Sequence, residues 1–316
     1  MSLTDFLTES TGLYKKYGLR GIQSASENFL RGLAVRLGSI TGAFNPPAKS
    51  ILETDWDLLI ILDACRWDIM RDVATEYDWL DPSPNKSYAS SSQDWLQKTF
   101  FLSPINKRKR LRTTFSLLRD PYQNDIIADT LELRDISDVA YITGNPQSTM
   151  VKSSQLSYLE ETWRRDLDYN ERTRILTDQT IQYRRREDPA RTIVHYMKPH
   201  EPFVENSPDG TAWQRLQWGE YDIDDLISDY KDNLRNVLED VELLLENTDA
   251  DDVVITADHG NSYGEYGFYG HRPYLPLKGM RQVPWVETSA IDRETYEPET
   301  DSGSEAESEV TRDEML

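Results

Sequence analysis

The sequence predicts a three-layer α/β/α fold built around a mostly parallel β-sheet. Short apolar runs, typical of strands buried on both faces, alternate along the chain with longer segments that carry helical periodicity. Polar residues follow directly after several of these runs. Because the loops after parallel strands meet at one edge of the sheet, where such folds bind their ligands, this pattern also indicates where a functional site would lie.

Four segments carry the strand prediction. Residues 58–62 form a continuous apolar run that ends at an aspartate, and residues 253–257 form another that is followed by an aspartate and a histidine. Between them, residues 139–143 end at a Gly-Asn-Pro turn, and residues 192–197 precede a Lys-Pro pair. Such short runs match strands better than helices.

An amphipathic helix is predicted immediately before the last of these strands. From Ile223 to Leu245, apolar residues recur at steps of three and four and form one stripe, with Asp232 and Glu239 among the charged residues opposite. A shorter helix is predicted to begin near Gln93, directly after a run of serines.

The chain divides into three segments. Residues 1–50 carry apolar side chains at helical spacing, which predicts a helical cap on the main domain or, alternatively, a helix at a membrane surface. Residues 51–286 hold the alternating strands and helices and form the predicted main domain. Residues 287–316 contain 11 acids and two bases, and we expect this tail to be disordered or, alternatively, to serve as an acidic interaction arm.

The composition is strongly acidic. Asp and Glu number 56 against 35 Lys and Arg, for a net charge of −21, which argues against nucleic acid as a partner because phosphate backbones attract a basic surface. The bases comprise 24 Arg and only 11 Lys. An acidic, lysine-poor surface is typical of proteins in molar salt, where charges are screened beyond about 3 Å, and it predicts a halophilic, haloarchaeal source. An ordinary acidic mesophilic protein is the alternative.

Several features predict a cytoplasmic protein. No apolar run approaches the roughly 20 residues of a membrane-spanning helix, and the N-terminus lacks the basic-then-apolar layout of a secretory signal. The single cysteine, Cys65, excludes an internal disulfide, and a buried apolar role is sufficient to explain it.

The four histidines of the chain, His195, His200, His259 and His271, all lie within one stretch. His259 and its neighbour Asp258 follow one predicted strand, and Asp63 follows another. Imidazole and carboxylate groups that converge at strand ends could hold Zn²⁺, Mn²⁺ or a harder ion. The alternatives are a helix cap for Asp63 and a structural hydrogen-bonded pair for Asp258 and His259.

These segments together resemble the alkaline phosphatase superfamily, which includes sulfatases, phosphodiesterases, phosphoglycerate mutases and phosphoglycerol transferases. Residues 59–68, Leu-Ile-Ile-Leu-Asp-Ala-Cys-Arg-Trp-Asp, are similar to its opening strand and first metal aspartate. Residues 254–261 resemble its Asp-His-Gly signature. Residues 270–285 resemble its last histidine ligand and the strand that follows, and residues 195–203 resemble its substrate loop. The resemblance implies an alkaline-phosphatase-like catalytic domain over residues 51–286.

The resemblance also implies metal ligands. Asp63, Asp258 and His259 would share one ion with the nucleophile. His271 would join a second metal or bind substrate, and His200 would bind that second metal or the transferring group. The family's two-metal site needs a further aspartate near His200 that this sequence lacks at the usual spacing, which favours a single ion.

The nucleophile of the family lies at a helix start, and the serine run before Gln93 fits that position. Ser92 is the first choice and Ser91 the second, with a plain helix N-cap as the alternative role of the run. His195, His200 and Arg66 are the candidates for contacting the substrate, with a core role as the alternative for His195. The basic run 107–112 is a further candidate for receiving an anionic headgroup, or else a solvated loop.

The sequence thus predicts a metal-dependent hydrolase or transferase that acts on phosphate or sulfate esters through a covalent serine intermediate. No arginine follows the serines at the position that formylglycine sulfatases require. The predicted cofactor is Zn²⁺ or Mn²⁺, as one or two ions, and the predicted partner is an anionic ester, sugar- or lipid-linked. The alternatives are a phosphosugar mutase and an inactive metal- or glycan-binding protein on the same scaffold. No oligomeric state is predicted.

Overall fold

The computed structural model of the 316-residue chain describes residues 50–102, 132–167, 171–203 and 211–299, with a few isolated positions before residue 50. Most of the predicted N-terminal segment 1–50, the basic run 107–112 and the tail after residue 299 lie outside the described residues. Val35, one of the isolated positions, is buried together with Leu275 and Met280.

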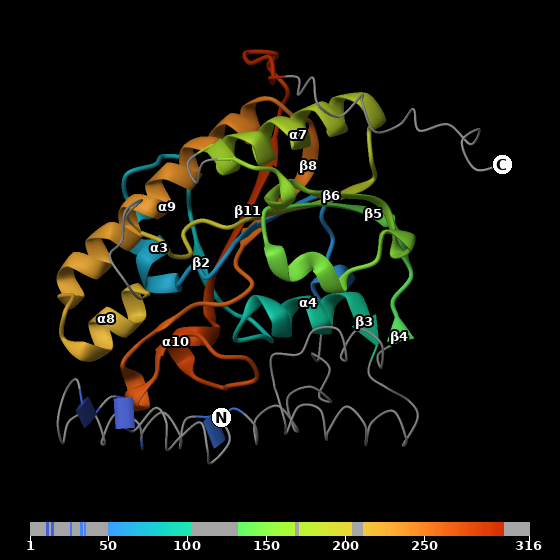
Figure 1. The fold of residues 1–316 in the computed structure, drawn as a ribbon. Helices are drawn as coiled ribbons and strands as arrows, with labels where there is room; N and C mark the ends of the chain where they lie inside the picture. Colours follow the sequence, from blue (N-terminus) through green and yellow to red (C-terminus); the bar gives the residue numbers. More distant parts are fainter. Residues whose placement is uncertain are drawn as a thin grey trace.

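A mixed seven-stranded sheet, in the order β2-β11-β8-β1-β7-β5-β6, forms the centre of the fold (Figure 1). The five strands from β8 to β6 are parallel, whereas β11 runs antiparallel to both β8 and β2. The strands are β1 (Leu58–Leu62), β2 (Ser83–Lys86), β5 (Ile136–Thr143), β6 (Leu156–Glu161), β7 (Arg191–Tyr196), β8 (Ala250–Thr256) and β11 (Gln282–Ala290). Two small antiparallel pairs are β3 (Phe101–Leu102) with β4 (Glu132–Leu133) and β9 (Ser262–Tyr263) with β10 (Tyr269–Gly270).

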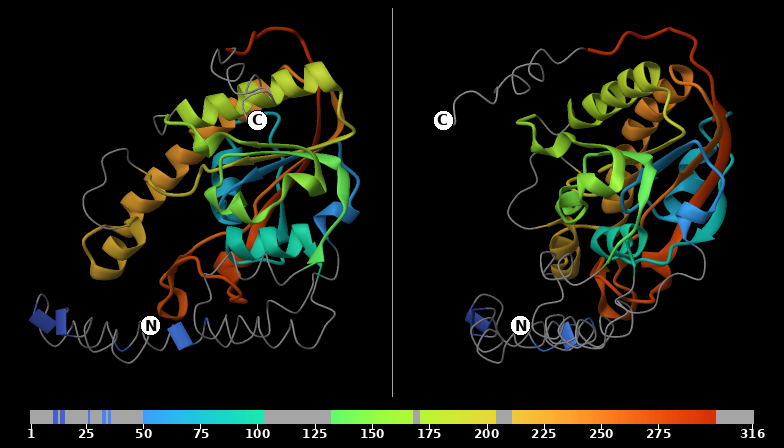
Figure 2. Two further views of the ribbon diagram at one scale, coloured as in Figure 1. Left: turned by 45° about the vertical axis from the view of Figure 1, so that its right-hand side comes forward. Right: turned by 90° about the vertical axis from the view of Figure 1, so that its right-hand side faces the viewer.

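Helices cover both faces of this sheet (Figure 2). One face is covered by α3 (Trp67–Ala74), α7 (Glu171–Glu187) and α9 (Ile223–Glu246), and the other by α4 (Ser92–Phe100). The remaining helical elements are α8 (Ala212–Trp218), α10 (Lys278–Arg281), η1 (Ile51–Glu53), η2 (Pro146–Met150), η3 (Ser153–Gln155), η4 (Thr162–Arg164) and η5 (Glu265–Gly267). The predicted three-layer α/β/α architecture is therefore confirmed.

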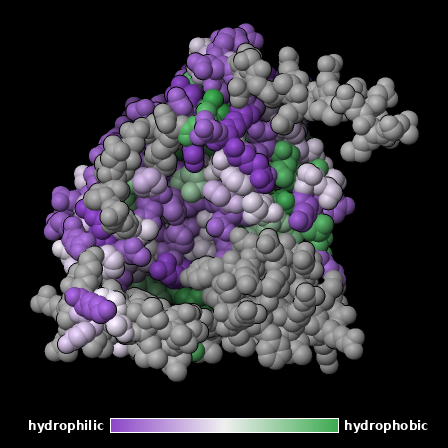
Figure 3. Space-filling view, viewed as in Figure 1, coloured by the Kyte–Doolittle hydropathy of each residue, from purple (hydrophilic) through white to green (hydrophobic). Residues whose placement is uncertain are grey.

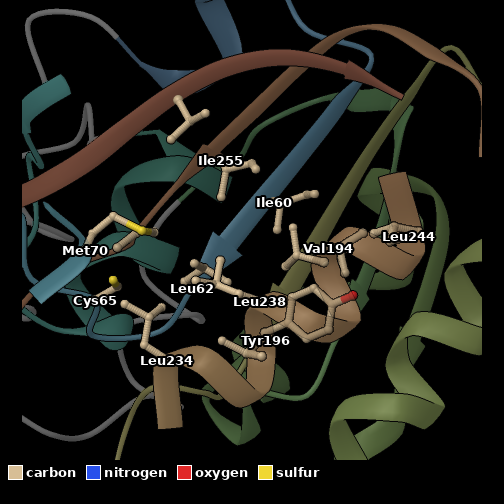
Figure 4. Close-up of a cluster of buried hydrophobic side chains, with 14 of the residues drawn as sticks. Ile60, Leu62, Cys65, Met70, Val194, Tyr196, Leu234, Leu238, Leu244 and Ile255 are labelled. Atoms are coloured by element: carbon tan, nitrogen blue, oxygen red, sulfur yellow. The ribbon is translucent and has the colours of Figure 1, made fainter. Parts of the chain in front are cut away.

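The strand β1 shows why the sheet has two helical layers. All five of its side chains are apolar and fully buried, and successive side chains point to opposite faces. Ile60 and Leu62 belong to the core cluster that includes Leu238 of α9 (Figure 4), whereas Leu59 and Ile61 pack in the cluster under α4. A polar side chain on either face of such a strand would be buried and would need a hydrogen-bond partner.

We expect the substitution Ile60→Ala to lower the free energy of unfolding by about 2–5 kcal/mol, because it leaves a cavity in a fully buried layer. Urea unfolding followed by circular dichroism measures the change. Ile291→Ala is the matched control, since Ile291 is 59% exposed and should cost little. Equal losses from the two variants would contradict this account of the core.

The four predicted strands and the long predicted helix are all present. β1 has the predicted bounds, and α9 begins at the predicted Ile223, where the Asp222 side chain caps it. Sequence patterns missed β2, β6 and α7. The surface of α7 explains the omission, because its many arginines and threonines obscure its apolar stripe.

The predicted boundary after residue 286 falls inside a strand. β11 continues to Ala290, where it still pairs with β8. Residues 291–299 then continue without regular secondary structure. Asp292 forms a bidentate ion pair with Arg185, and the Asn247 side chain accepts hydrogen bonds from the backbone of Thr295 and Tyr296. The expected disorder from residue 287 is therefore wrong for residues 287–299. Charge alone did not exclude a strand, since Glu287 points outward while Val286 is buried.

The described surface in Figure 3 is mostly hydrophilic, with hydrophobic residues in small separate areas. No helix among the described residues is long and apolar enough to cross a membrane. The halophilic origin stays a prediction.

That prediction has a direct test in the dependence of stability on salt. A net charge of −21 repels itself at low ionic strength, and screening at about 1 M salt shortens the range of the repulsion to about 3 Å. We expect the Tm to rise steadily as KCl increases from low to molar concentration in thermal unfolding scans. A Tm that stays flat or falls would contradict the halophilic interpretation.

Candidate metal centre

The three central strands bring the candidate ligands to one edge of the sheet. β1 lies between β7 and β8, and its Ile61 is in register with His195 of β7 and with Thr256 of β8. Asp63 directly follows the end of β1, and Asp258 follows two residues after Thr256. Because the three strands are parallel, their carboxyl ends coincide, and polar residues distant in sequence meet there.

Two carboxylates and two imidazoles converge at this edge. The Nε2 atom of His259 lies 3.5 Å from an oxygen of Asp63 and 3.5 Å from an oxygen of Asp258. The Nε2 atom of His195 lies 3.6 Å and 3.7 Å from the same two carboxylates. The expected convergence of Asp63, Asp258 and His259 is thus observed, and His195 joins them.

Three of these ligand atoms have no hydrogen-bond partner within the described part of the chain. They are Asp63 Oδ1, Asp258 Oδ2 and His195 Nε2, all fully buried. The ligand atoms of these three residues all lie within 4.8 Å of one another. Buried carboxylate oxygens without a partner are costly, and a cation between them would remove the cost. Oxygen and imidazole donors in this combination fit Zn²⁺ or Mn²⁺.

Backbone contacts fix the orientation of His259. Its Nδ1 atom lies 2.8 Å from the carbonyl oxygen of Gly260, which can only accept, so Nδ1 carries the proton. In the neutral ring Nε2 then keeps its lone pair and faces the carboxylates. A Cβ atom on Gly260 would lie 2.5 Å from the carbonyl oxygen of Gly279, so only glycine fits after this histidine.

The two carboxylates are held by different donors. Asp258 Oδ1 accepts the backbone N–H groups of Ala64 at 3.0 Å and of His259 at 2.8 Å. Asp63 Oδ2 accepts the side-chain amide of Asn145 at 2.6 Å and the hydroxyl of Ser92 at 3.0 Å. In each case one oxygen is anchored, and the other is directed at the shared space.

The charges of the cluster are unevenly distributed. Burial raises the pKa of Asp258, and the neighbouring negative charge of Asp63 raises it further. Burial alone also raises the pKa of Asp63, but the three nearby imidazoles of His195, His200 and His259 outweigh burial and lower it. Two carboxylates this close repel each other, and a divalent cation would relieve the repulsion.

The helix α4 brings a serine hydroxyl to the cluster. Ser92 Oγ donates to Asp63 at 3.0 Å and lies 3.3 Å from Nε2 of His259. The preceding Ser91 is the N-cap, and its hydroxyl accepts the backbone N–H of Asp94 at 3.2 Å. The two serines that the sequence left open therefore have different surroundings, and only Ser92 contacts the cluster.

His200 and His271 form a second, half-buried group beside the first. The ring of His271 lies 4.3 Å from that of His259 and 5.2 Å from that of His200, measured between centroids. His271 Nδ1 contacts Asn261 Oδ1 at 3.0 Å, and His200 Nδ1 contacts the carbonyl oxygen of Glu201 at 2.6 Å. Both rings thus have one nitrogen engaged in a position-fixing contact.

Arg66 is not directed at the cluster. Its guanidinium group forms a bidentate ion pair with Asp68, donates to the carbonyl oxygen of Asn261 and to Glu265, and stacks 3.8 Å from the ring of Tyr263. These partners occupy the donors that a substrate would need. Arg66 therefore fixes the loop that contains Asn261, and its expected substrate contact is not supported by this geometry.

The position of His195 also differs from its expected role in contacting the substrate. It is fully buried, its Nδ1 contacts the hydroxyl of Tyr141 at 2.9 Å, and its Nε2 faces the two carboxylates. Asn145 was not among the predicted site residues, although it stands two residues after the end of β5, close to the position that Asp63 has after β1. Its place after a strand of the same sheet was the available signal, but the Gly-Asn-Pro sequence was interpreted only as a turn.

No family model and no curated protein matches the sequence. Several solved structures are similar, among them three of phosphoethanolamine transferases. The integral membrane lipooligosaccharide phosphoethanolamine transferase A (EptA) from Neisseria meningitidis matches with a TM-score of 0.50 and 14% identity over 92% of this chain and 59% of that one. The soluble domain of the Neisseria meningitidis enzyme matches with a TM-score of 0.44 and 16% identity, over 78% of this chain and 79% of that one. The C-terminal periplasmic domain of phosphoethanolamine transferase EptC from Campylobacter jejuni matches with a TM-score of 0.45 and 17% identity, over 73% of this chain and 78% of that one.

At these identities the likeness concerns the fold alone. The chain spans about three fifths of the length of the integral membrane EptA. Its sheet and two helical layers have the arrangement that the sequence predicted. The fold of this chain is thus the alkaline-phosphatase-like α/β fold of its structural neighbours.

Proposed function

We propose that this chain is a metal-dependent enzyme that cleaves or transfers an anionic ester, with phosphate as the first candidate and sulfate as the second, through a covalent intermediate on Ser92. The position of the Ser92 hydroxyl carries the proposal. It lies at the first residue of α4 and contacts Asp63 and His259, beside ligand atoms that lack a partner. Such a hydroxyl has both a site for a cation and a helix N-terminus next to it.

The proposed ligands of the cation are Asp63, Asp258, His259 and, as a revision of its expected substrate role, His195. The described residues contain a single group of three or more ligand atoms this close together, which favours one ion. His200 and His271 then remain for the transferred group or for a second ion. Bound in this cluster, Zn²⁺ or Mn²⁺ would lower the pKa of a hydroxyl and withdraw charge from the ester oxygens.

The residues of the chain supply the remaining steps. Asp63 accepts the hydrogen bond of the Ser92 hydroxyl and so orients its oxygen. As the hydroxyl proton passes to Asp63, a bond forms from Ser92 Oγ to the phosphorus atom, the ester P–O bond breaks, and the leaving oxygen takes up a proton from water. The N–H groups at the start of α4 favour the anionic group. Water or an acceptor alcohol then displaces the serine. Attack by water gives hydrolysis, and attack by an alcohol gives transfer.

The acceptor and the substrate are the finer part of the proposal. The structural neighbour EptA transfers phosphoethanolamine, and this supports a phosphate ester, sugar- or lipid-linked, as the substrate class. A phosphosugar mutase would use the same intermediate, and a binding protein would hold the cation without turnover. We propose residues 51–290 as the catalytic domain, extended from 286 because β11 runs to Ala290.

The proposal is tested with the full-length chain in high salt. Purified protein is loaded with Zn²⁺ or Mn²⁺, its metal content is measured after dialysis, and turnover is assayed on an aryl phosphate, an aryl phosphodiester and an aryl sulfate. Peptide mass spectrometry after an acid quench then locates any phosphoryl or sulfuryl group. Metal bound with turnover and a modified Ser92 is the expected result, whereas metal bound without turnover on any ester would favour the binding protein.

A further inference from the structure

A cavity lies on the other side of β8 from β1, where β11 and the edge strand β2 meet the start of α4. Its volume is about 610 Å³, within the range of cavities that hold small organic molecules. The strands β11 and β2 are labelled in Figure 1. The lining residues come from η1, β2, α4, the end of β8, α10 and β11.

The charge of this cavity differs from that of the protein. Asp and Glu account for 56 of the 316 residues, yet none of the fifteen lining residues is acidic. The two charged residues in the lining are Lys86 and Arg281. Among the described residues neither forms an ion pair, and Arg281 donates only its Nε–H group, to the carbonyl oxygen of Ser87 at 2.8 Å. Two unpaired cations without a facing carboxylate predict a bound anion.

Two acids on neighbouring elements, Glu287 of β11 and Asp94 of α4, are already engaged. Glu287 accepts the indole N–H of Trp285 at 2.8 Å, and the buried Asp94 pairs with Lys98 at 2.9 Å. Neither acid lines the cavity. The positive charge of Lys86 and Arg281 is therefore available to a ligand.

Three aromatic residues, Tyr88, Trp95 and Trp285, also line the cavity. Aromatic side chains offer large flat surfaces that a ring can cover, and a cavity of this size exceeds what an inorganic anion fills. We propose that this cavity binds an aromatic organic anion, with its ring against the tryptophan and tyrosine walls and its anionic group at Lys86 and Arg281.

The cavity shares structural elements with the metal centre but not its ligands. Ala257, which lines the cavity, precedes Asp258, and Ser87 donates its hydroxyl to the backbone carbonyl of Asp258 at 2.5 Å. Trp95 packs edge-on against His195, with ring centroids 5.6 Å apart. A ligand in the cavity would therefore lie behind the metal centre, and its binding should not require the metal.

The test uses anilinonaphthalene sulfonate, a fluorescent aromatic sulfonate, with the folded full-length protein freed of metal. We expect saturable binding of one molecule per chain by fluorescence and by calorimetry. The variants Lys86→Ala and Arg281→Ala should each weaken binding about tenfold, because a charge-assisted hydrogen bond contributes on that scale. Trp285→Ala should also weaken binding, and Asp258→Asn should leave it unchanged.

Lys278→Ala is the matched control, since Lys278 is an exposed lysine of α10 that does not line the cavity. Equal weakening by this control, or undiminished binding in the Lys86→Ala and Arg281→Ala variants, would overturn the proposal. Lys86 lies on an exposed edge strand, so its variant keeps the test valid if Arg281→Ala unfolds. Displacement of the probe by an equal concentration of inorganic sulfate would overturn the role of the aromatic walls.

Discussion

Ser92→Ala is expected to reduce turnover of the aryl ester by about a thousandfold or more while the protein still binds its metal. Removing a nucleophile that contacts the cluster adds about 4 kcal/mol or more to the barrier, and about 1.4 kcal/mol corresponds to tenfold in rate. The ligand atoms of Asp63, Asp258 and His259 remain in place, because Ser92 is one contact among several that hold them. Steady-state kinetics and metal analysis on the same preparation measure both effects.

Ser91→Ala is the matched control for this prediction. The Ser91 hydroxyl caps α4 and is engaged with the backbone N–H of Asp94, so its loss should cost about 0.5–2 kcal/mol of stability and leave turnover within about tenfold. If Ser91→Ala abolishes turnover and Ser92→Ala does not, the nucleophile is the neighbouring serine. If both variants retain activity, no serine of this helix start forms the intermediate, and water would be the attacking group.

Asp258→Asn is expected to abolish both metal binding and turnover. The substitution removes a charged oxygen that faces the shared space and leaves a cation there with one carboxylate instead of two. In the wild type, Zn²⁺ at about a hundred times its Kd should add about 2.7 kcal/mol of stability and raise the Tm. In the variant this increase should disappear, which gives a measurement that does not depend on activity.

Asp252→Asn provides the comparison on the same strand. Asp252 is exposed on β8, and its carboxylate is distant from the sheet edge at which Asp258 lies. This variant should bind metal, gain stability from Zn²⁺ and turn over substrate as the wild type does. A retained metal-dependent rise in Tm for Asp258→Asn would mean that Asp258 is not a ligand.

Local patterns in the sequence determined the elements at the centre of the fold. Short, mostly apolar runs identified β1, β7 and β8, because strands in the middle of a sheet covered on both faces bury most of their side chains. The stripe of α9 was equally clear, since one face of that helix must pack on the sheet. The charged end of β11 and the arginine-rich α7 were missed, because an exposed face hides the pattern of a buried one.

The sequence also placed Asp63, Asp258 and His259 at strand ends, and parallel strands bring such ends together. It could not decide which of Ser91 and Ser92 reaches the cluster, because that choice depends on where α4 begins relative to β1 and β8. The position of His195 was likewise decided by register, since pairing with Ile61 sets its side chain between the two carboxylates. A shift of one residue would turn that side chain to the other face of the sheet.

Arg66 and Asn145 show the same limit. An arginine two residues from an aspartate can form an ion pair or remain available to substrate, and only the positions of Asn261 and Glu265, brought near by the fold, favour the first. Asn145 reaches Asp63 because β5 and β1 flank β7 in one sheet. Residue types and strand ends are local properties that the sequence determines, whereas contacts between distant side chains depend on strand order and register, which only the tertiary structure decides.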